Sequence, residues 1–214
     1  MLKVQKFVVN MIEENCYVLS DESKDAVVID CGILYPEEAD AFRSYINDNE
    51  LKVTHLINTH CHFDHIFGDG FIYKTYNILP EMSRNEVQLY KQLPKQLEMF
   101  LHRELPIIQP PVGRIFDAGE TITFGTHKLD IIATPGHTPG GVCFYCEKER
   151  ILFSGDSLFY HEIGRTDFPG GNYGSLISSL KNNILTLPED VTVCPGHGDT
   201  TTVGEEKRQN PYLQ

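Results

Sequence analysis

The sequence predicts a domain of the α/β class, built from two halves that each place strands before helices. Short apolar or β-branched runs bounded by polar turns indicate the strands, and longer stretches with apolar residues at helical spacing indicate the helices. The chain has 214 residues, of which 41% are hydrophobic and 22% charged, so one core can bury most of its apolar surface. We therefore expect residues 1–214 to form a single domain.

The first half begins with apolar runs separated by polar turns, which indicates strands joined by hairpins. Pro36 follows them at a position that the first turn of a helix tolerates, and acidic residues come directly after it. The expected elements are strands at residues 3–9, 16–19 and 26–30, a helix at residues 36–50, and a compact apolar strand at residues 53–58.

The second half repeats this arrangement after a connecting segment. Residues 84–104 have helical character interrupted by Pro94, and the stretch after them is rich in proline and loop-like. We consider residues 81–112 a helical lid beside a site or a surface connection. The remaining expected elements are strands at residues 122–124, 127–133, 142–146, 150–153 and 191–194, and a helix at residues 175–187.

Composition excludes several classes of function. The net charge of −12 disfavours nucleic acid as a partner, because nucleic-acid affinity depends largely on Lys and Arg contacts to phosphates. No apolar run reaches membrane-spanning length, and the amino terminus has no signal-peptide pattern, so we expect a cytoplasmic protein without membrane contact. Six cysteines are expected to be free and mostly buried, including the C-x-x-C pair Cys143 and Cys146, which lies in a predicted strand.

The segment THCHFDH directly follows the strand at residues 53–58 and carries the first chemistry. Residues two apart in an extended chain project to the same side, so His60 and His62 can bind one ion together. If the chain then turns, Asp64 and His65 face a neighbouring position. Imidazole and carboxylate are ligands suited to Zn²⁺, Fe or Mn. Packing does not explain four such groups within six residues, so a metal site is the preferred interpretation.

Three later positions share a common local pattern. His137 lies in TPGHTPGG, Asp156 in FSGDSLF and His197 in CPGHGD, each beside a predicted strand and close to glycine. Glycine lets the backbone turn sharply or approach another segment closely. A lone histidine in a glycine-rich turn is more often structural than a ligand. The order of the three positions after the HCHFDH segment makes them a coherent set of candidate ligands.

These motifs in this order resemble the metallo-β-lactamase superfamily, and the resemblance covers about residues 1–200. It implies an αββα sandwich of two mixed β-sheets flanked by helices, with metal ions at one edge of the sheets. By this resemblance, two divalent cations are held by seven side chains, with Zn²⁺ the expected metal and Fe or Mn the alternatives. The first would bind His60, His62 and His137, the second Asp64, His65 and His197, and Asp156 would bridge both.

Two further segments, IGRTDFPGGN and TTVGEEKRQNPYL, resemble the short glyoxalase II-like branch, whose members hydrolyse hydroxyacylglutathione. Full-length glyoxalase II enzymes add a helical domain with basic residues for the glutathione carboxylates, and the present sequence ends before such a domain. Arg165, Lys207 and Arg208 are the cations that could replace it, with Arg165 the candidate substrate contact. Aspartate at position 156, where antibiotic-degrading zinc β-lactamases typically carry Cys or Ser, points away from that branch.

The expected chemistry is hydrolysis of a small thioester or ester. Two cations roughly 3.5 to 4 Å apart would share a water, lower its pKa toward about 7 and so provide a metal-bound hydroxide as the nucleophile. A thiolate is a good leaving group, which fits a site where no Ser, Cys or Lys is placed as a protein nucleophile. Asp64 would serve as a proton shuttle besides binding metal. The sequence does not predict the acyl group, the thiol or the oligomeric state.

Three other functions stay open. A persulfide dioxygenase-like protein with a single Fe(II) would retain the same motifs, and iron content with oxygen uptake would identify it. A phosphodiesterase or ribonuclease would need a basic substrate face. A non-catalytic or electron-transfer role would need a flavin-bearing partner. The remaining histidines are interpreted as non-ligands: His55, His102, His127 and His161.

Overall fold

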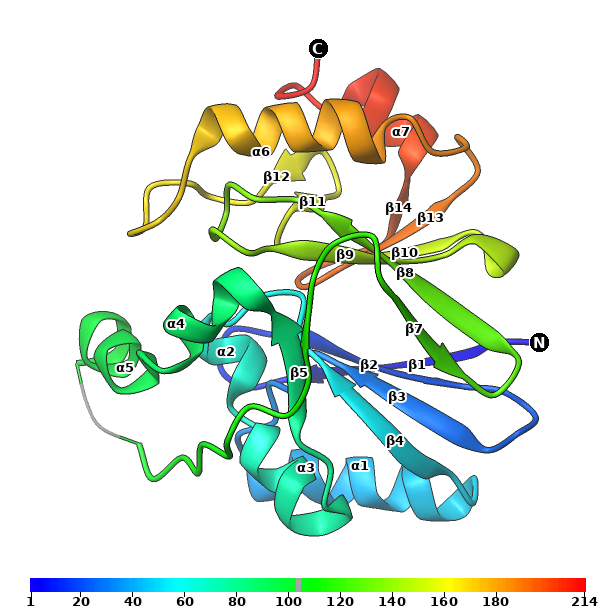
Figure 1. The fold of residues 1–214 in the computed structure, drawn as a ribbon, viewed down its shortest axis with the longest axis vertical. Coiled ribbons are helices and arrows are strands. Elements are labelled where there is room, and N and C mark those ends of the chain that lie inside the picture. The colour runs from blue at the N-terminus through cyan, green and yellow to red at the C-terminus, as the bar shows by residue number, and fades with distance from the viewer. Residues whose placement is uncertain (103–104) are drawn as a thin grey trace.

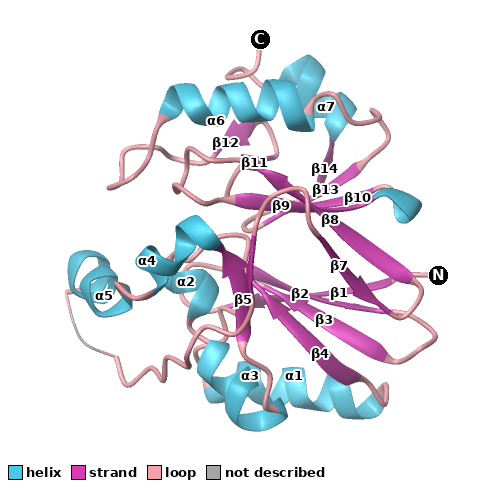
Figure 2. Ribbon diagram, in the orientation of Figure 1, coloured by secondary structure: helices cyan, strands magenta, loops and turns pink. Residues whose placement is uncertain are grey.

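The computed structural model describes residues 1–102 and 105–214. In these residues two six-stranded sheets lie face to face, and helices cover both outer faces (Figures 1 and 2). The αββα sandwich of two mixed sheets is therefore confirmed. Among the described residues, no helix combines the length and apolar character that crossing a bilayer requires.

The first sheet has the strand order β1-β2-β3-β4-β5-β6. Its first three strands pair antiparallel through hairpins, as the sequence predicts, and the pairs from β3 to β6 are parallel. The strands are β1 (Lys3–Val9), β2 (Glu14–Ser20), β3 (Asp25–Ile29), β4 (Lys52–Ile57), β5 (Pro80–Ser83) and β6 (Ile115–Phe116).

The second sheet has the order β14-β13-β10-β9-β8-β7, in which only the pair β10 and β13 is parallel among the described strands. A separate hairpin of β11 (Leu158–Phe159) and β12 (Glu162–Ile163) follows β10. The sheet strands are β7 (Thr121–Phe124), β8 (His127–Ala133), β9 (Val142–Cys146), β10 (Ile151–Gly155), β13 (Thr192–Pro195) and β14 (Thr201–Thr202).

Helices α1 (Pro36–Asp48) and α3 (Asp69–Tyr76) cover the first sheet, while α6 (Tyr173–Ser179) and α7 (Val203–Gln209) cover the second (Figure 1). Helix α1 has proline in its first turn and buries Phe42 completely. Burying such a ring contributes roughly 1.5–3 kcal/mol. A change of Phe42 to alanine would therefore remove the main contact between α1 and the sheet.

The central strands are buried on both faces, which explains why they read as nearly continuous apolar runs. Every residue of β2 and of β9 is buried. Phe144 and Cys146 of β9 belong to the core between the two sheets, whereas Cys143 and Tyr145 face the layer of α6. The two cysteines of the C-x-x-C pair thus lie on opposite faces. All six cysteines are free and buried, which confirms the prediction.

The segment before the second half differs from the single interrupted helix that was predicted. It consists of a 3₁₀ turn (Arg84–Glu86), α4 (Val87–Tyr90) and α5 (Leu93–Leu101), and Pro94 lies in the first turn of α5, where its missing N–H costs nothing. The last two residues of the predicted helix, 103 and 104, lie outside the described residues. A lid function for residues 81–112 stays a prediction.

The helix predicted at residues 175–187 begins two residues earlier. The Asn172 side chain accepts a hydrogen bond from the backbone N–H of Ser175, so the cap fixes the start of α6 at Tyr173. The helix then continues as a π-helix over Leu180–Ile184 and ends before the predicted boundary. Helices α3 and α7 and strands β5, β6, β11, β12 and β14 were not predicted.

Candidate metal centre

The HCHFDH segment connects β4 to a short helix, α2 (Phe63–Ile66). His62 precedes α2 with an extended backbone, at φ −68° and ψ 150°, and all of α2 is buried. The change from extended chain to helix therefore occurs between His62 and Asp64, as the residue spacing suggested. Because of this change, His60 and His62 face one side of the loop while Asp64 and His65 belong to the first turn of the helix.

The other three predicted positions lie in loops that follow strands of the second sheet. His137 lies in the loop from β8 to β9, Asp156 directly follows β10, and His197 closely follows β13. Gly155 has a φ of +48°, which a side chain would strain. A Cβ atom at Gly196 would collide with the carboxylate of Asp156. Gly155 is thus required by the conformation of the turn, and Gly196 by its close approach to Asp156.

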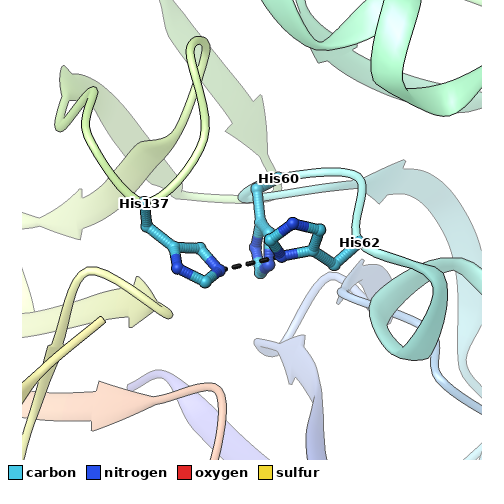
Figure 3. A group of neighbouring side chains, drawn as sticks. All are labelled: His60, His62 and His137. Atoms are coloured by element: carbon cyan, nitrogen blue, oxygen red, sulfur yellow. Dashed lines mark hydrogen bonds between the residues drawn. The ribbon is translucent and has the colours of Figure 1, made fainter. Parts of the chain in front are cut away.

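His60, His62 and His137 come together although 75 residues separate His62 from His137 (Figure 3). Nδ1 of His62 lies 2.8 Å from Nε2 of His137. The three rings are nearly perpendicular to one another, with centroids 4.6 to 4.9 Å apart. One nitrogen from each ring therefore lies close enough to the other two to share a single cation.

Asp64, His65 and His197 form a second group of the same kind. Nε2 of His197 lies 3.1 Å from Oδ2 of Asp64, and Nε2 of His65 lies 3.6 Å from the same oxygen. Asp64 and His65 are buried, and His197 is half-buried at the surface of the pocket. The structure thus groups the six side chains as two triads, in the same division that the resemblance implies.

The carboxylate of Asp156 lies between the two triads. Its Oδ1 atom is 3.3 Å from Nε2 of His65, and its Oδ2 atom is 3.6 Å from Nε2 of His137 and 3.8 Å from Nε2 of His197. Oδ2 also lies 4.0 Å from Nε2 of His60. A single carboxylate therefore reaches both groups.

Four of the five histidines form a hydrogen bond through Nδ1, the ring nitrogen that faces away from the two triads. Nδ1 of His137 donates to the carbonyl of Arg165, at 2.7 Å, and Nδ1 of His197 donates to the carbonyl of Ile12, at 3.1 Å. A hydrogen bond of this kind selects one tautomer and leaves the second nitrogen free as a ligand. The other two held rings are His60, beside the Thr59 hydroxyl, and His65, beside Asp30.

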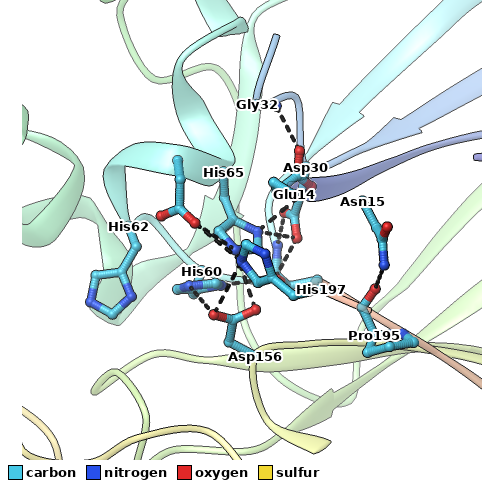
Figure 4. A network of polar contacts seen from close by, with 12 residues as sticks. Glu14, Asn15, Asp30, Gly32, His60, His62, His65, Asp156, Pro195 and His197 are labelled. Carbon is cyan, nitrogen blue, oxygen red and sulfur yellow. Dashed lines mark hydrogen bonds and ion pairs between the residues drawn. The ribbon is translucent and has the colours of Figure 1, made fainter. Parts of the chain in front are cut away.

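Asp30 and Glu14 lie on one side of His65, and Asp156 lies on the other (Figure 4). Asp30 is close enough to His60 and His65 to resemble a third ligand group. Both of its oxygens, however, already accept hydrogen bonds from Thr59, and one of them accepts from His65 as well. Asp30 therefore orients His65. Sequence reasoning missed it, although a carboxylate directly after an apolar strand is the pattern that identified Asp156.

Glu86 is a second residue that the sequence did not reveal. Its carboxylate is completely buried and accepts the backbone N–H of Cys61 at 2.8 Å and that of Gly140 at 2.7 Å. Cys61 lies between His60 and His62, and Gly140 belongs to the loop of His137. Glu86 thus ties together the two loops that carry the first triad.

The centre has the donor set that a cation requires. Nε2 of His60, Nε2 of His65 and Oδ1 of Asp156 are buried without a hydrogen-bond partner among the described residues. Buried polar atoms without partners are costly, and one cation in each triad would together satisfy all three. Imidazole nitrogens with carboxylate oxygens suit Zn²⁺, Fe and Mn. The residues present therefore fit divalent metal.

The protonation states of the histidines also suit the binding of a cation. Burial, together with the nearby His137, lowers the pKa of His62 to about 3, and burial lowers the pKa of His60 as well, so both rings are neutral ligands at physiological pH. Burial alone would lower the pKa of His65, but the carboxylates of Asp156 and Asp64 outweigh it and raise that pKa. The carboxylates thus attract a positive charge to the second triad.

A pocket of about 620 Å³ opens in front of the two triads. The side chain of Arg165 lines it, and its Nε and a terminal nitrogen donate to both oxygens of Asp167 at 2.8 and 2.7 Å. Lys207 and Arg208 lie on α7 and pair with Glu189, away from the residues that line this pocket.

The remaining histidines have partners elsewhere. His55 pairs with Glu81, His161 with Glu205, and His127 lies between Asp21 and Glu149. His102 ends α5 in a left-handed conformation. These side chains do not belong to either triad.

The sequence of residues 12–197 matches the family model of the metallo-beta-lactamase superfamily. The chain belongs to the metallo-β-lactamase superfamily. Hydroxyacylglutathione hydrolase GloC of Haemophilus influenzae is 34% identical over 215 residues, which cover 99% of this chain and 98% of that protein. The resemblance inferred from the motifs is confirmed.

Two solved structures of the superfamily are similar over the whole chain. The crystal structure of the BLEG-1 B3 metallo-beta-lactamase superposes with a TM-score of 0.89 and 35% identity, covering 100% of both chains. That of TTHA1623 in a di-iron-bound form superposes with a TM-score of 0.86 and 31% identity, covering 98% of this chain and 100% of the other. Two solved structures thus share the fold of this chain over nearly its whole length.

Proposed function

We propose that the protein is a metal-dependent hydrolase that cleaves a small thioester, in the manner of glyoxalase II. The observation that carries the proposal is the convergence of two triads and a central carboxylate at the floor of one pocket. The name of the Haemophilus influenzae relative, a hydroxyacylglutathione hydrolase, supports this reaction type.

The proposal assigns the binding of two divalent cations to seven side chains. When bound, the cations supply Lewis acidity, which activates water at neutral pH and polarises a substrate carbonyl. The first cation would be held by His60, His62 and His137, the second by Asp64, His65 and His197, and Asp156 would contact both. Zn²⁺ is our first choice, and the di-iron form of TTHA1623 makes iron the main alternative.

The lining of the pocket supports water as the attacking group. Among the described residues that line it, none is Ser, Thr, Cys or Lys, so no side chain offers a hydroxyl, thiol or amine nucleophile. Asp64 lines the pocket, and its Oδ2 atom lies 3.1 Å from Nε2 of His197, a position from which the carboxylate can receive a proton from water. A thiolate leaves without a strong general acid, so a thioester suits this lining better than an amide.

The substrate is proposed to be a small molecule. A nucleic acid would have to approach a chain of net charge −12. The pocket also contains only one Lys or Arg among its described lining residues, and that residue, Arg165, already pairs with Asp167. Phosphodiester hydrolysis on a polymer is therefore the weaker alternative.

The test combines metal analysis with four assays on the purified protein. Zinc or iron at up to two equivalents, together with hydrolysis of S-lactoylglutathione or of acyl thioesters of N-acetylcysteamine, would support the proposal. Oxygen uptake with a persulfide would indicate the iron dioxygenase instead. Hydrolysis of the β-lactam nitrocefin is included because BLEG-1 is named a B3 metallo-beta-lactamase. A fully metallated protein that cleaves none of the thioesters contradicts the proposed function.

A further inference from the structure

The pocket has one wall made of aromatic rings. Phe63 and Phe100 stack with centroids 5.2 Å apart, and Phe100 contacts Phe168 at 4.6 Å. The edge of this wall reaches the metal centre, because the Phe168 ring lies 5.7 Å from that of His62. These rings come from α2, from α5 and from the loop before α6. Three separate segments thus form one apolar surface beside the first triad.

Further apolar side chains line the same pocket near the second triad. The Phe159 ring lies 6.4 Å from that of His197, and Ile163 and Ile12 also line the pocket. Ile12 is held there because its carbonyl accepts the hydrogen bond from His197. Ile12 is 40% exposed, so its side chain is accessible to a ligand in the pocket. Both triads therefore have apolar neighbours.

Apart from the proposed cations, the charged side chains around the pocket offer no free partner to an anionic ligand. The Arg165 guanidinium is bound by Asp167 through two hydrogen bonds and lies 3.7 Å above the Phe168 ring. Its charge is therefore neutralised, and its flat face extends the aromatic wall. Glu162 adds a further carboxylate to the lining. A ligand with several carboxylates gains no unpaired partner from the described lining.

We propose that the site selects thioesters with an uncharged apolar acyl group, which packs against Phe100 and Phe168, and that it does not recognise the glutathione carboxylates. This inference rests on the proposed thioester hydrolysis and specifies its substrate. We assign the apolar wall to the acyl group because the thiols of common thioesters are polar amides or charged peptides, whereas unsubstituted alkyl acyl chains are apolar. Arg165 then shapes the wall through its stack on Phe168.

Binding of uncleavable analogues tests the inference independently of turnover. The analogues are N-acetylcysteamine derivatives in which a methylene separates sulfur from the ketone (S–CH₂–CO–R), with R as methyl, propyl and pentyl. Calorimetry on the zinc-loaded protein gives each dissociation constant. Each buried methylene is expected to tighten binding about three- to fourfold, so the step from methyl to propyl is about tenfold. The glutathione analogue with R as propyl is expected to bind no more tightly than the N-acetylcysteamine one.

Two variants locate the contact on one helix. Phe100→Ala is expected to reduce the tenfold step between methyl and propyl to about twofold, because the wall loses its central ring. Met99→Ala is the matched control: Met99 is the preceding residue of α5, is 53% exposed and does not line the pocket. In Met99→Ala, the dissociation constants of the methyl and propyl analogues should still differ about tenfold.

The outcomes separate this inference from the proposed function. Equal affinity across the series, no binding at all, or a glutathione analogue that binds more than tenfold better than its N-acetylcysteamine counterpart would overturn the inference. Graded binding that Phe100→Ala reduces to a step of about twofold and that Met99→Ala retains supports it. Parallel hydrolysis assays with the matching thioesters test the proposed function, because graded binding without any hydrolysis contradicts the thioesterase alone.

Discussion

Oδ2 of Asp30 lies 3.0 Å from Nδ1 of His65, on the side of the ring opposite to Asp156. The contact joins the end of β3 in the first sheet to a candidate metal ligand. Because the ring is held through Nδ1, its Nε2 atom points between Asp64 and Asp156. Asp30 thus acts on the centre directly through His65 and, through the Thr59 hydroxyl, indirectly on His60.

Asp30→Ala should weaken metal binding at the second triad. Loss of an outer carboxylate that orients a histidine ligand typically costs 10- to 100-fold in metal affinity. Competition with a chromogenic zinc chelator would measure that change for each of two binding steps, and we expect the larger loss of affinity at the step that fills the second triad, because His65 bonds Asp30 directly whereas His60 reaches it only through Thr59. Asp48→Ala, at the exposed end of α1, is the control. Equal zinc affinities in wild type and Asp30→Ala would show that Asp30 has no orienting role.

Glu86→Gln should both destabilise the fold and impair the first triad. The glutamine amide retains one acceptor oxygen, so its NH₂ group faces either the Cys61 or the Gly140 N–H, and one buried donor loses its partner. We expect the free energy of unfolding to fall by about 1–3 kcal/mol in urea denaturation. Zinc affinity should fall with it. Glu98→Gln, on the exposed face of α5, is the matched control; a similar loss there would refute the specific role.

Asp21 should make stability depend on pH far from the metal centre. Burial would raise its pKa, but hydrogen bonds from Ser23, Thr126 and His127 outweigh burial and hold the pKa well below its usual range. A depressed native pKa means that the stabilisation is complete above the unfolded value of about 3.9 and is lost as pH falls below it.

Urea denaturation of wild type and Asp21→Asn from pH 7 to pH 3 tests this dependence. The wild-type advantage in unfolding free energy should be constant above about pH 5 and should shrink toward pH 3. Taking the difference between the two proteins cancels the titration of the metal centre. An advantage that stays constant across the whole range would show that the Asp21 charge does not contribute.

Metal should stabilise the native protein, because the triads exist only when the two sheets are packed. At a free zinc concentration 100 times the dissociation constant, each site would add about 2.7 kcal/mol to the unfolding free energy. Thermal unfolding with and without chelator measures the effect. His62→Ala and Asp156→Ala should each reduce the zinc-dependent rise in Tm and lower thioester kcat/KM by at least about 100-fold. Either variant with undiminished turnover would refute the assignment of the ligands.

Much of the centre was predictable because its residues follow strands. His60, His137, Asp156 and His197 each come shortly after an apolar run, and such runs identify the strand ends. The glycines beside them were equally visible. Asp30 was missed although it too follows an apolar strand, and Glu86 was missed because it stands in an ordinary local context. Their partners lie 35 and 54 residues away, at His65 and Gly140, and no local periodicity reports such distances.

The sequence predicted the strands that carry the loops and the seven candidate metal ligands, and the resemblance of its motifs to a known superfamily implied the αββα class. Only the folded chain decides which ring nitrogen of each histidine faces inward, which carboxylate stays behind His65, and which rings line the pocket. The spacing of apolar and polar residues in a segment predicts the secondary structure of that segment and the face that it buries. The directions in which side chains from different loops meet depend on how the two sheets pack against each other.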